Sequence, residues 1–152
     1  VDSSPHRAAL PPVYNSYARV AAEPGYDRSF DELRSLLFPL YATSFCLYDF
    51  LSDNQWFGAS QIIIVSASSK TAIGLAFALA QDEAAPVSMA LTSARNKAMV
   101  AGLGLYDAVA TYDALGEIDA AAPTVIIDMS GNGGVLSALH ARLGDNMRYC
   151  SN

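Results

Sequence analysis

Apolar residues from position 61 onward fall into short continuous runs that alternate with stretches of helical spacing. The run at 61–66 contains Ile62, Ile63, Ile64 and Val65, and such β-branched runs are typical of a strand that is buried on both faces. A turn rich in Ser and Ala follows it. Apolar side chains then recur at helical spacing over 70–81. This stretch therefore predicts a buried strand, a tight turn and a helix.

The same alternation continues to the end of the sequence. Further strands are predicted over 87–91, 108–110, 124–128 and 147–151, and further helices over 94–102 and 134–143. Because the strands alternate with helices of this length, we expect right-handed crossovers between parallel strands. The predicted fold class is α/β, a three-layer domain of the Rossmann type with a parallel sheet in the order 3-2-1-4-5.

The N-terminal part of the sequence lacks this alternation. Residues 1–30 are rich in Pro, Tyr and Ala and show no clear period, which indicates an irregular arm. We expect residues 1–58 to form this arm together with linker helices, and residues 59–152 to form the Rossmann-type domain. The first residue is Val1 rather than Met, so we expect a processed or partial piece of a longer protein.

Helical spacing first appears near the end of the arm. Ser29 followed by Asp31 and Glu32 is typical of a helix start, because acids in the first turn favour the helix dipole. Pro39 is expected to open a second helical run. The apolar stripe of that run consists of Leu40, Ser44, Leu47 and Leu51.

Composition and charge exclude several classes of protein. A hydrophobic content of 52% with 16% charged residues is typical of a globular chain. The net charge of −6 argues against nucleic-acid binding, which needs a basic face. No apolar run is long enough to span a membrane. Cys46 and Cys150 are isolated and no metal-ligand spacing occurs, so we expect reduced thiols, no metal site and a cytoplasmic location.

Lysine and arginine are rare in the central part of the chain. Between Ser35 and Ala141 they occur only as Lys70, Arg95 and Lys97. All three follow the carboxyl ends of the first two predicted strands, and ligands bind at that edge of an open α/β sheet. Solvated charges on exposed helix turns are the alternative interpretation, and for Lys70 we prefer it.

The turn after the first strand is the predicted pyrophosphate site. Small residues let a phosphate approach the backbone, and a helix N-terminus offers N–H groups and positive potential. We assign this role to Ser68, Ser69, Lys70, Thr71 and Ala72, with the N–H groups of Ser69 to Ala72 as the expected donors.

The segment after the second strand predicts which dinucleotide binds. A cofactor with a free ribose diol favours an acid there, whereas the sequence reads Thr-Ser-Ala-Arg-Asn-Lys over 92–97. Hydroxyls and cations suit a 2′-phosphate, and two charge-assisted hydrogen bonds would favour NADP over NAD by about 100-fold or more. Ser93, Arg95 and Lys97 are therefore the candidate ligands of the 2′-phosphate.

These motifs resemble the nucleotide-binding domain of the medium-chain dehydrogenase/reductase superfamily, in particular its quinone-oxidoreductase-like branch. The three positions of that branch's A-x-x-G-x-x-G pattern are occupied here by Ser68, Thr71 and Gly74. Segments 92–97, 102–107 and 125–131 are similar to its 2′-phosphate segment, its L-G-A-D turn and its fourth strand with a glycine turn. The chain resembles still more closely an offshoot catalogued as a domain of unknown function, through HRAALPPVYNSY, PLYATSFCLYDFL and SASSKTAIGLAFAL.

The resemblance implies an NADP(H)-binding domain of an oxidoreductase that acts on a carbonyl or an activated alkene. It also implies that Tyr112 lies near the 2′-phosphate and that Gly131 and Asn132 border the nicotinamide. The family's catalytic domain lies outside these 152 residues, so no catalytic residue is assigned. We expect a small-molecule substrate and allow for a homodimer. Ser68 and Thr71 depart from the family pattern, because they place hydroxyls where it has glycines.

Other functions are compatible with parts of the sequence. An NADP(H) sensor without turnover, or a structural Rossmann domain that takes no dinucleotide, would use the same fold. The segment IIDMSGNGG at 126–134 resembles the glycine loop of S-adenosylmethionine-dependent methyltransferases, which requires several further strands and an acid at the end of the next one. A P-loop at SSKT is excluded, because Ile64 and Ser69 replace its glycines.

Overall fold

The computed structural model describes residues 2–151 and divides them into two compact units. The first unit ends at Arg34 and the second begins at Ser35. Short 3-10 turns make up most of the ordered structure of the first unit, at Pro5–Arg7, Pro12–Asn15, Val20–Ala22 and Arg28–Phe30. The predicted irregular arm is therefore confirmed.

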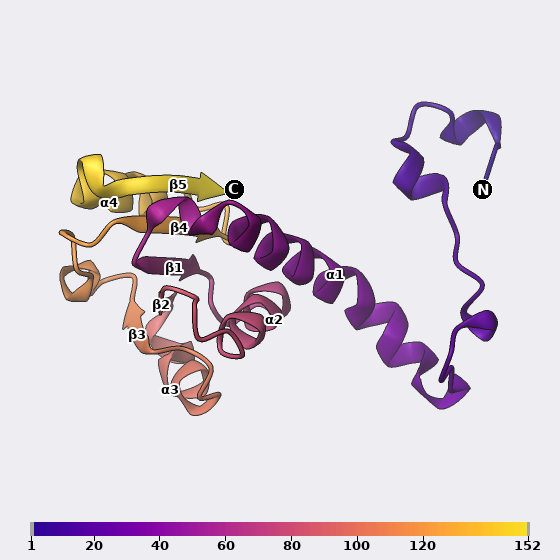
Figure 1. The fold of residues 1–152 in the computed structure, drawn as a ribbon, viewed down its shortest axis with the longest axis horizontal. Coiled ribbons are helices and arrows are strands. Elements are labelled where there is room, and N and C mark those ends of the chain that lie inside the picture. The colour runs from indigo at the N-terminus through magenta and orange to yellow at the C-terminus, as the bar shows by residue number, and fades with distance from the viewer. Residues whose placement is uncertain (1, 152) are drawn as a thin grey trace. The chain divides into compact units, whose positions relative to one another are not determined.

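A five-stranded sheet forms the centre of the second unit. Its strands are β1 (Gln61–Val65), β2 (Val87–Thr92), β3 (Ala108–Thr111), β4 (Thr124–Asp128) and β5 (Met147–Ser151). All neighbouring strands are parallel and the order is β3-β2-β1-β4-β5, as Figure 1 shows. The predicted fold class and strand order are confirmed.

Four α-helices accompany the sheet in the described chain. They are α1 (Asp31–Asp53), α2 (Lys70–Leu79), α3 (Ala94–Gly102) and α4 (Gly133–Leu143). Three of them follow β1, β2 and β4 directly, as the alternation of apolar runs predicts. The helix predicted over 70–81 ends at Leu79, and the next residues form a turn.

Helices cover both faces of the sheet, so the domain has three layers. On one face α1 and α2 pack on alternate strand residues, and the buried cluster there includes Leu51, Leu75, Ile62, Ile64 and Ile127. On the other face α4 packs on the intervening residues, and its cluster includes Leu139, Leu143, Ile63, Val65 and Ile126. Because β1 is buried on both faces, its continuous β-branched sequence is explained.

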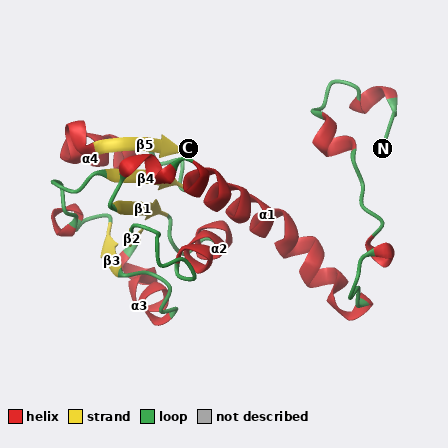
Figure 2. Cartoon of the chain, viewed as in Figure 1, coloured by secondary structure: helices red, strands yellow, loops and turns green. Residues whose placement is uncertain are grey.

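The helix boundary predicted at Pro39 is wrong, because α1 runs through this residue without interruption (Figure 2). Proline inside a helix leaves the carbonyl four residues earlier without its partner, at a cost of about 3 kcal/mol. That carbonyl belongs to Ser35, which is exposed, so water can hydrate it. Packing of the predicted stripe holds the helix together. Its residues Leu40 and Leu47 are half-buried, and Ser44 and Leu51 are fully buried.

Candidate functional site

The carboxyl edge of the sheet brings three turns together, those after β1, β2 and β4. Two backbone hydrogen bonds extend the ladders of β1 beyond its last residue. The Ala67 N–H donates to the Leu91 carbonyl at 3.2 Å, and the Met129 N–H donates to the Val65 carbonyl at 3.3 Å. The end of β1 therefore lies between the ends of β2 and β4, where the strand order reverses. Ligands of doubly wound sheets bind at this point.

The turn from β1 into α2 begins with a residue in the left-handed region, Ser66, at φ +59°. The Ser69 N–H donates to the Ser66 carbonyl at 2.9 Å, and Ser69 Oγ accepts the Ala72 N–H at 3.2 Å as the N-cap of α2. The expectation that all N–H groups from Ser69 to Ala72 are available is therefore wrong. Of the four N–H groups from Ser69 to Ala72, those of Lys70 and Thr71 have no protein partner among the described residues.

The start of α3 differs from that of α2 in how its N-cap serine is used. Ser93 is the N-cap of α3, but its side chain makes no capping hydrogen bond. Its hydroxyl is thus not committed to the helix that it precedes. Arg95 is exposed and Lys97 is half-buried in the first turn. Cations at a helix N-terminus oppose the helix dipole, and a bound anion would offset that cost.

One side-chain hydrogen bond joins the two helix starts. Asn96, in the first turn of α3, donates from Nδ2 to Ser68 Oγ at 2.9 Å. This contact brings the segment of Arg95 and Lys97 next to the β1–α2 turn. Asn96 is not among the site residues predicted from the sequence, although it stands between two candidate phosphate ligands.

The side chain of Tyr106 binds the same turn by a hydrogen bond. Its hydroxyl donates to the Ala67 carbonyl at 2.8 Å, and burial raises the pKa of Tyr106 well above its usual value. The tyrosine therefore stays protonated and keeps its donor role at any ordinary pH. Sequence reasoning also missed this residue, because Ala67 and Tyr106 are far apart in the chain.

The turn from β4 into α4 lines a cavity of about 490 Å³, together with Leu136 of the helix. Asp128 Oδ1 accepts hydrogen bonds from the Ser130 N–H at 2.8 Å and the Ser130 hydroxyl at 2.6 Å. Gly131 has φ +63°, a conformation that favours glycine. Asn132 Oδ1 caps α4 by accepting the N–H groups of Gly134 and Val135.

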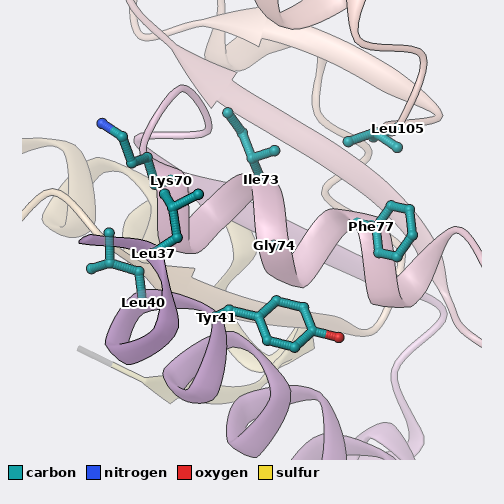
Figure 3. A pocket seen from close by; sticks show the side chains of 8 residues that line it. All are labelled: Leu37, Leu40, Tyr41, Lys70, Ile73, Gly74, Phe77 and Leu105. Carbon is teal, nitrogen blue, oxygen red and sulfur yellow. The ribbon is translucent and has the colours of Figure 1, made fainter. Parts of the chain in front are cut away.

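Tyr112 and Lys70 lie at the borders of this edge. The Tyr112 N–H donates to the Thr92 carbonyl at 3.1 Å, and its ring packs against the apolar cluster under α4. Lys70 is exposed and lines an apolar groove of about 320 Å³ between α1 and α2. Figure 3 shows Lys70 and Phe77 at opposite ends of this groove, with Tyr41 facing α2. The outward position preferred for Lys70 is confirmed.

Thr92 is an orphaned polar group at the end of β2. Its side chain is 1% exposed, and Oγ1 has no hydrogen-bond partner among the described residues. A buried hydroxyl without a partner costs about 1–3 kcal/mol. Such a group beside Ser93 is consistent with a polar ligand at this edge.

A doubly wound sheet with two helix starts at its switch point fits a nucleotide-binding-like α/β domain. The chain belongs to the family described as protein of unknown function (DUF2855), whose model matches residues 1–152. The expected resemblance to a domain of unknown function is thereby confirmed. A search of curated proteins found no match.

Neither a metal-binding cluster nor a membrane-spanning helix occurs among the described residues. Within residues 2–151 no group of three or more His, Cys, Asp or Glu side chains could hold a metal ion. No helix of this part of the chain has the length and apolar character needed to cross a bilayer. Cys46 and Cys150 are both free thiols.

Proposed function

We propose that this chain is the NADP(H)-binding part of an oxidoreductase that reduces a carbonyl or an activated alkene, related to the medium-chain reductases. The observation that carries the proposal is the joining of two anion-binding features at the switch point. The free N–H groups of Lys70 and Thr71 lie on one helix start, and Arg95 and Lys97 lie on the other. The Asn96 hydrogen bond links them.

The pyrophosphate would bind at the β1–α2 turn. The N–H groups of Lys70 and Thr71 point out of the first turn of α2, where the helix dipole favours an anion. Ser68 and Thr71 add hydroxyls that can donate to phosphate oxygens. Ser69 and Ala72 stabilise the turn, because Ser69 Oγ accepts a hydrogen bond from the Ala72 N–H.

The adenosine 2′-phosphate would bind at the start of α3. Ser93 offers a hydroxyl that its own helix does not use, and Arg95 and Lys97 supply the charge. No acid stands in segment 92–97 to accept a ribose diol. Thr92 Oγ1 is a further candidate donor, and Tyr112 borders the same strand end.

The nicotinamide would lie towards the β4–α4 turn, where Gly131 lines the cavity at the end of β4 and Asn132 is the N-cap of α4. A bound NADPH supplies the hydride, whereas the residues of this chain bind and orient the cofactor. Asp128 keeps this turn in place through its two hydrogen bonds to Ser130.

Two alternatives use the same residues differently. A structural domain that takes no dinucleotide is favoured by the hydroxyls of Ser68 and Thr71, which narrow the approach to the backbone that glycines would leave open. An NADP(H) sensor would bind the cofactor through the same residues without turnover. The methyltransferase interpretation is disfavoured, since the strand that follows segment 126–134 is β5, and its sequence MRYCS contains no acid.

Calorimetric titration of the chain with NADPH and with NADH tests the proposal. We expect NADPH to bind with a micromolar Kd and NADH about 100-fold more weakly, because two charge-assisted contacts to the 2′-phosphate are lost. If the folded protein binds neither nucleotide, the proposal fails and the structural alternative stands.

A further inference from the structure

The hydrogen bond between Asn96 and Ser68 has a direction, and this direction constrains the serine. Asn96 Nδ2 is the donor and Ser68 Oγ the acceptor, at 2.9 Å. A serine hydroxyl has one hydrogen and two lone pairs. Asn96 occupies a lone pair, and no hydrogen bond of the described residues uses the Ser68 hydrogen. The hydroxyl is therefore left with its donor available.

Without this contact the Ser68 hydroxyl could donate to other acceptors. Serine side chains in turns commonly donate to nearby backbone carbonyls, which removes them as donors to a ligand. The NH₂ group of Asn96 cannot accept a hydrogen, so the Ser68 hydrogen must point away from α3. Ser68 is half-buried, so the surrounding turn further restricts the directions in which its hydroxyl can donate.

We propose that Asn96 is a positioning residue that turns the Ser68 hydroxyl into a fixed donor for the dinucleotide pyrophosphate. The inference rests on the proposed function and adds a residue that contacts no ligand itself. It also explains why Asn96 stands between Arg95 and Lys97, since the turn of α3 that holds the 2′-phosphate then orders the pyrophosphate donor as well.

The proposal predicts a pattern across the two nucleotides. NADPH and NADH share the pyrophosphate, so Asn96→Ala should weaken both by the same factor. A change at Arg95 should weaken NADPH alone. Equal losses for both nucleotides are thus the signature of the pyrophosphate contact, and loss of NADPH alone would assign Asn96 to the 2′-phosphate and overturn the positioning role.

A double-mutant cycle measured by calorimetry tests the coupling. We expect Ser68→Ala to weaken NADPH binding about tenfold or more, the effect of a hydrogen bond to a charged group, and Asn96→Ala to weaken it about threefold or more. In the Ser68→Ala background Asn96→Ala should have no further effect, because the group it positions is gone. Additive losses would overturn the proposal.

Asn96→Asp provides a nearly isosteric second variant that keeps the contact and so preserves the fold. The carboxylate accepts the Ser68 hydrogen and reverses the bond, so NADPH and NADH should both bind more weakly than with Asn96→Ala. This extra loss should shrink when Ser68→Ala is added, whereas simple charge repulsion would leave it unchanged and overturn the proposal.

Failure of the inference differs from failure of the proposed function. If the wild-type chain binds neither NADPH nor NADH, the proposed function falls. If Asn96→Ala and Asn96→Asp bind NADPH and NADH as tightly as the wild type does, only the positioning role of Asn96 is contradicted. Thermal unfolding of each variant confirms that binding is measured on folded protein.

Discussion

Gly74→Ala should lower the free energy of unfolding by about 1–3 kcal/mol, although alanine is the better helix former. A Cβ at this position would lie 2.6 Å from Ser44 Oγ and 3.0 Å from Ser44 Cβ. Ser44 is fully buried, and its Oγ lies within hydrogen-bond distance of the Leu40 and Thr71 carbonyls. The new methyl group would therefore separate α1 from α2 and disturb the hydrogen bond from Ser44 Oγ to the Thr71 carbonyl. Figure 3 shows the close approach of the two helices at Gly74.

Urea denaturation of Gly74→Ala beside a matched control checks this result. Gly102, the last residue of α3, has no atom within 4 Å of an added Cβ, so Gly102→Ala should leave stability unchanged or raise it slightly. Adding Ser44→Gly to Gly74→Ala should recover part of the loss by making room. Equal stability of Gly74→Ala and Gly102→Ala would contradict the close helix contact.

Arg95→Ala should weaken NADPH binding about tenfold or more and leave NADH binding almost unchanged. The guanidinium of an arginine forms charge-assisted hydrogen bonds to phosphate, each contributing roughly 1.5–3 kcal/mol. NADH has no 2′-phosphate, so the substitution removes no phosphate contact from the NADH complex. Competition titrations with both nucleotides give the ratio directly.

The control for Arg95→Ala removes the same charge elsewhere. Arg148 is an exposed cation on β5, which β1 and β4 separate from β2. Arg148→Ala should change the affinities for NADPH and NADH little, by a general field effect that salt screens. If both variants reduce NADPH binding equally, the 2′-phosphate is not bound at the start of α3.

The sheet could be predicted because its signal is local. The continuous β-branched sequence of β1 and the alternation with helices predict a parallel sheet with right-handed crossovers. The order 3-2-1-4-5 is the one expected of a Rossmann-type domain. Pro39 shows the limit of such reasoning. A proline is a local signal for a helix start, but packing of Ser44 and Leu51 on the rest of the domain outweighs its cost and keeps α1 continuous.

The site was only partly predictable for a similar reason. The segments around Ser68 and Arg95 were identifiable from their positions after predicted strands. The partner of each hydrogen-bonding group could not be predicted, because it depends on contacts between distant segments. Asn96 to Ser68 and Tyr106 to Ala67 are two such contacts. Gly74 illustrates the same point, because its neighbour across the helix contact is Ser44 of α1.

Amide resonances of the isotope-labelled chain during a titration with NADPH test the central claim most directly. Lys70 and Thr71 carry N–H groups without a protein partner at the start of α2, so their resonances should shift most, together with those of segment 93–97. Ser88 and Asp107, hydrogen-bonded at the opposite edge of the sheet, should not shift. Absence of shifts at Lys70 and Thr71, or shifts confined to that opposite edge or to the groove between α1 and α2, would contradict a dinucleotide site at the switch point.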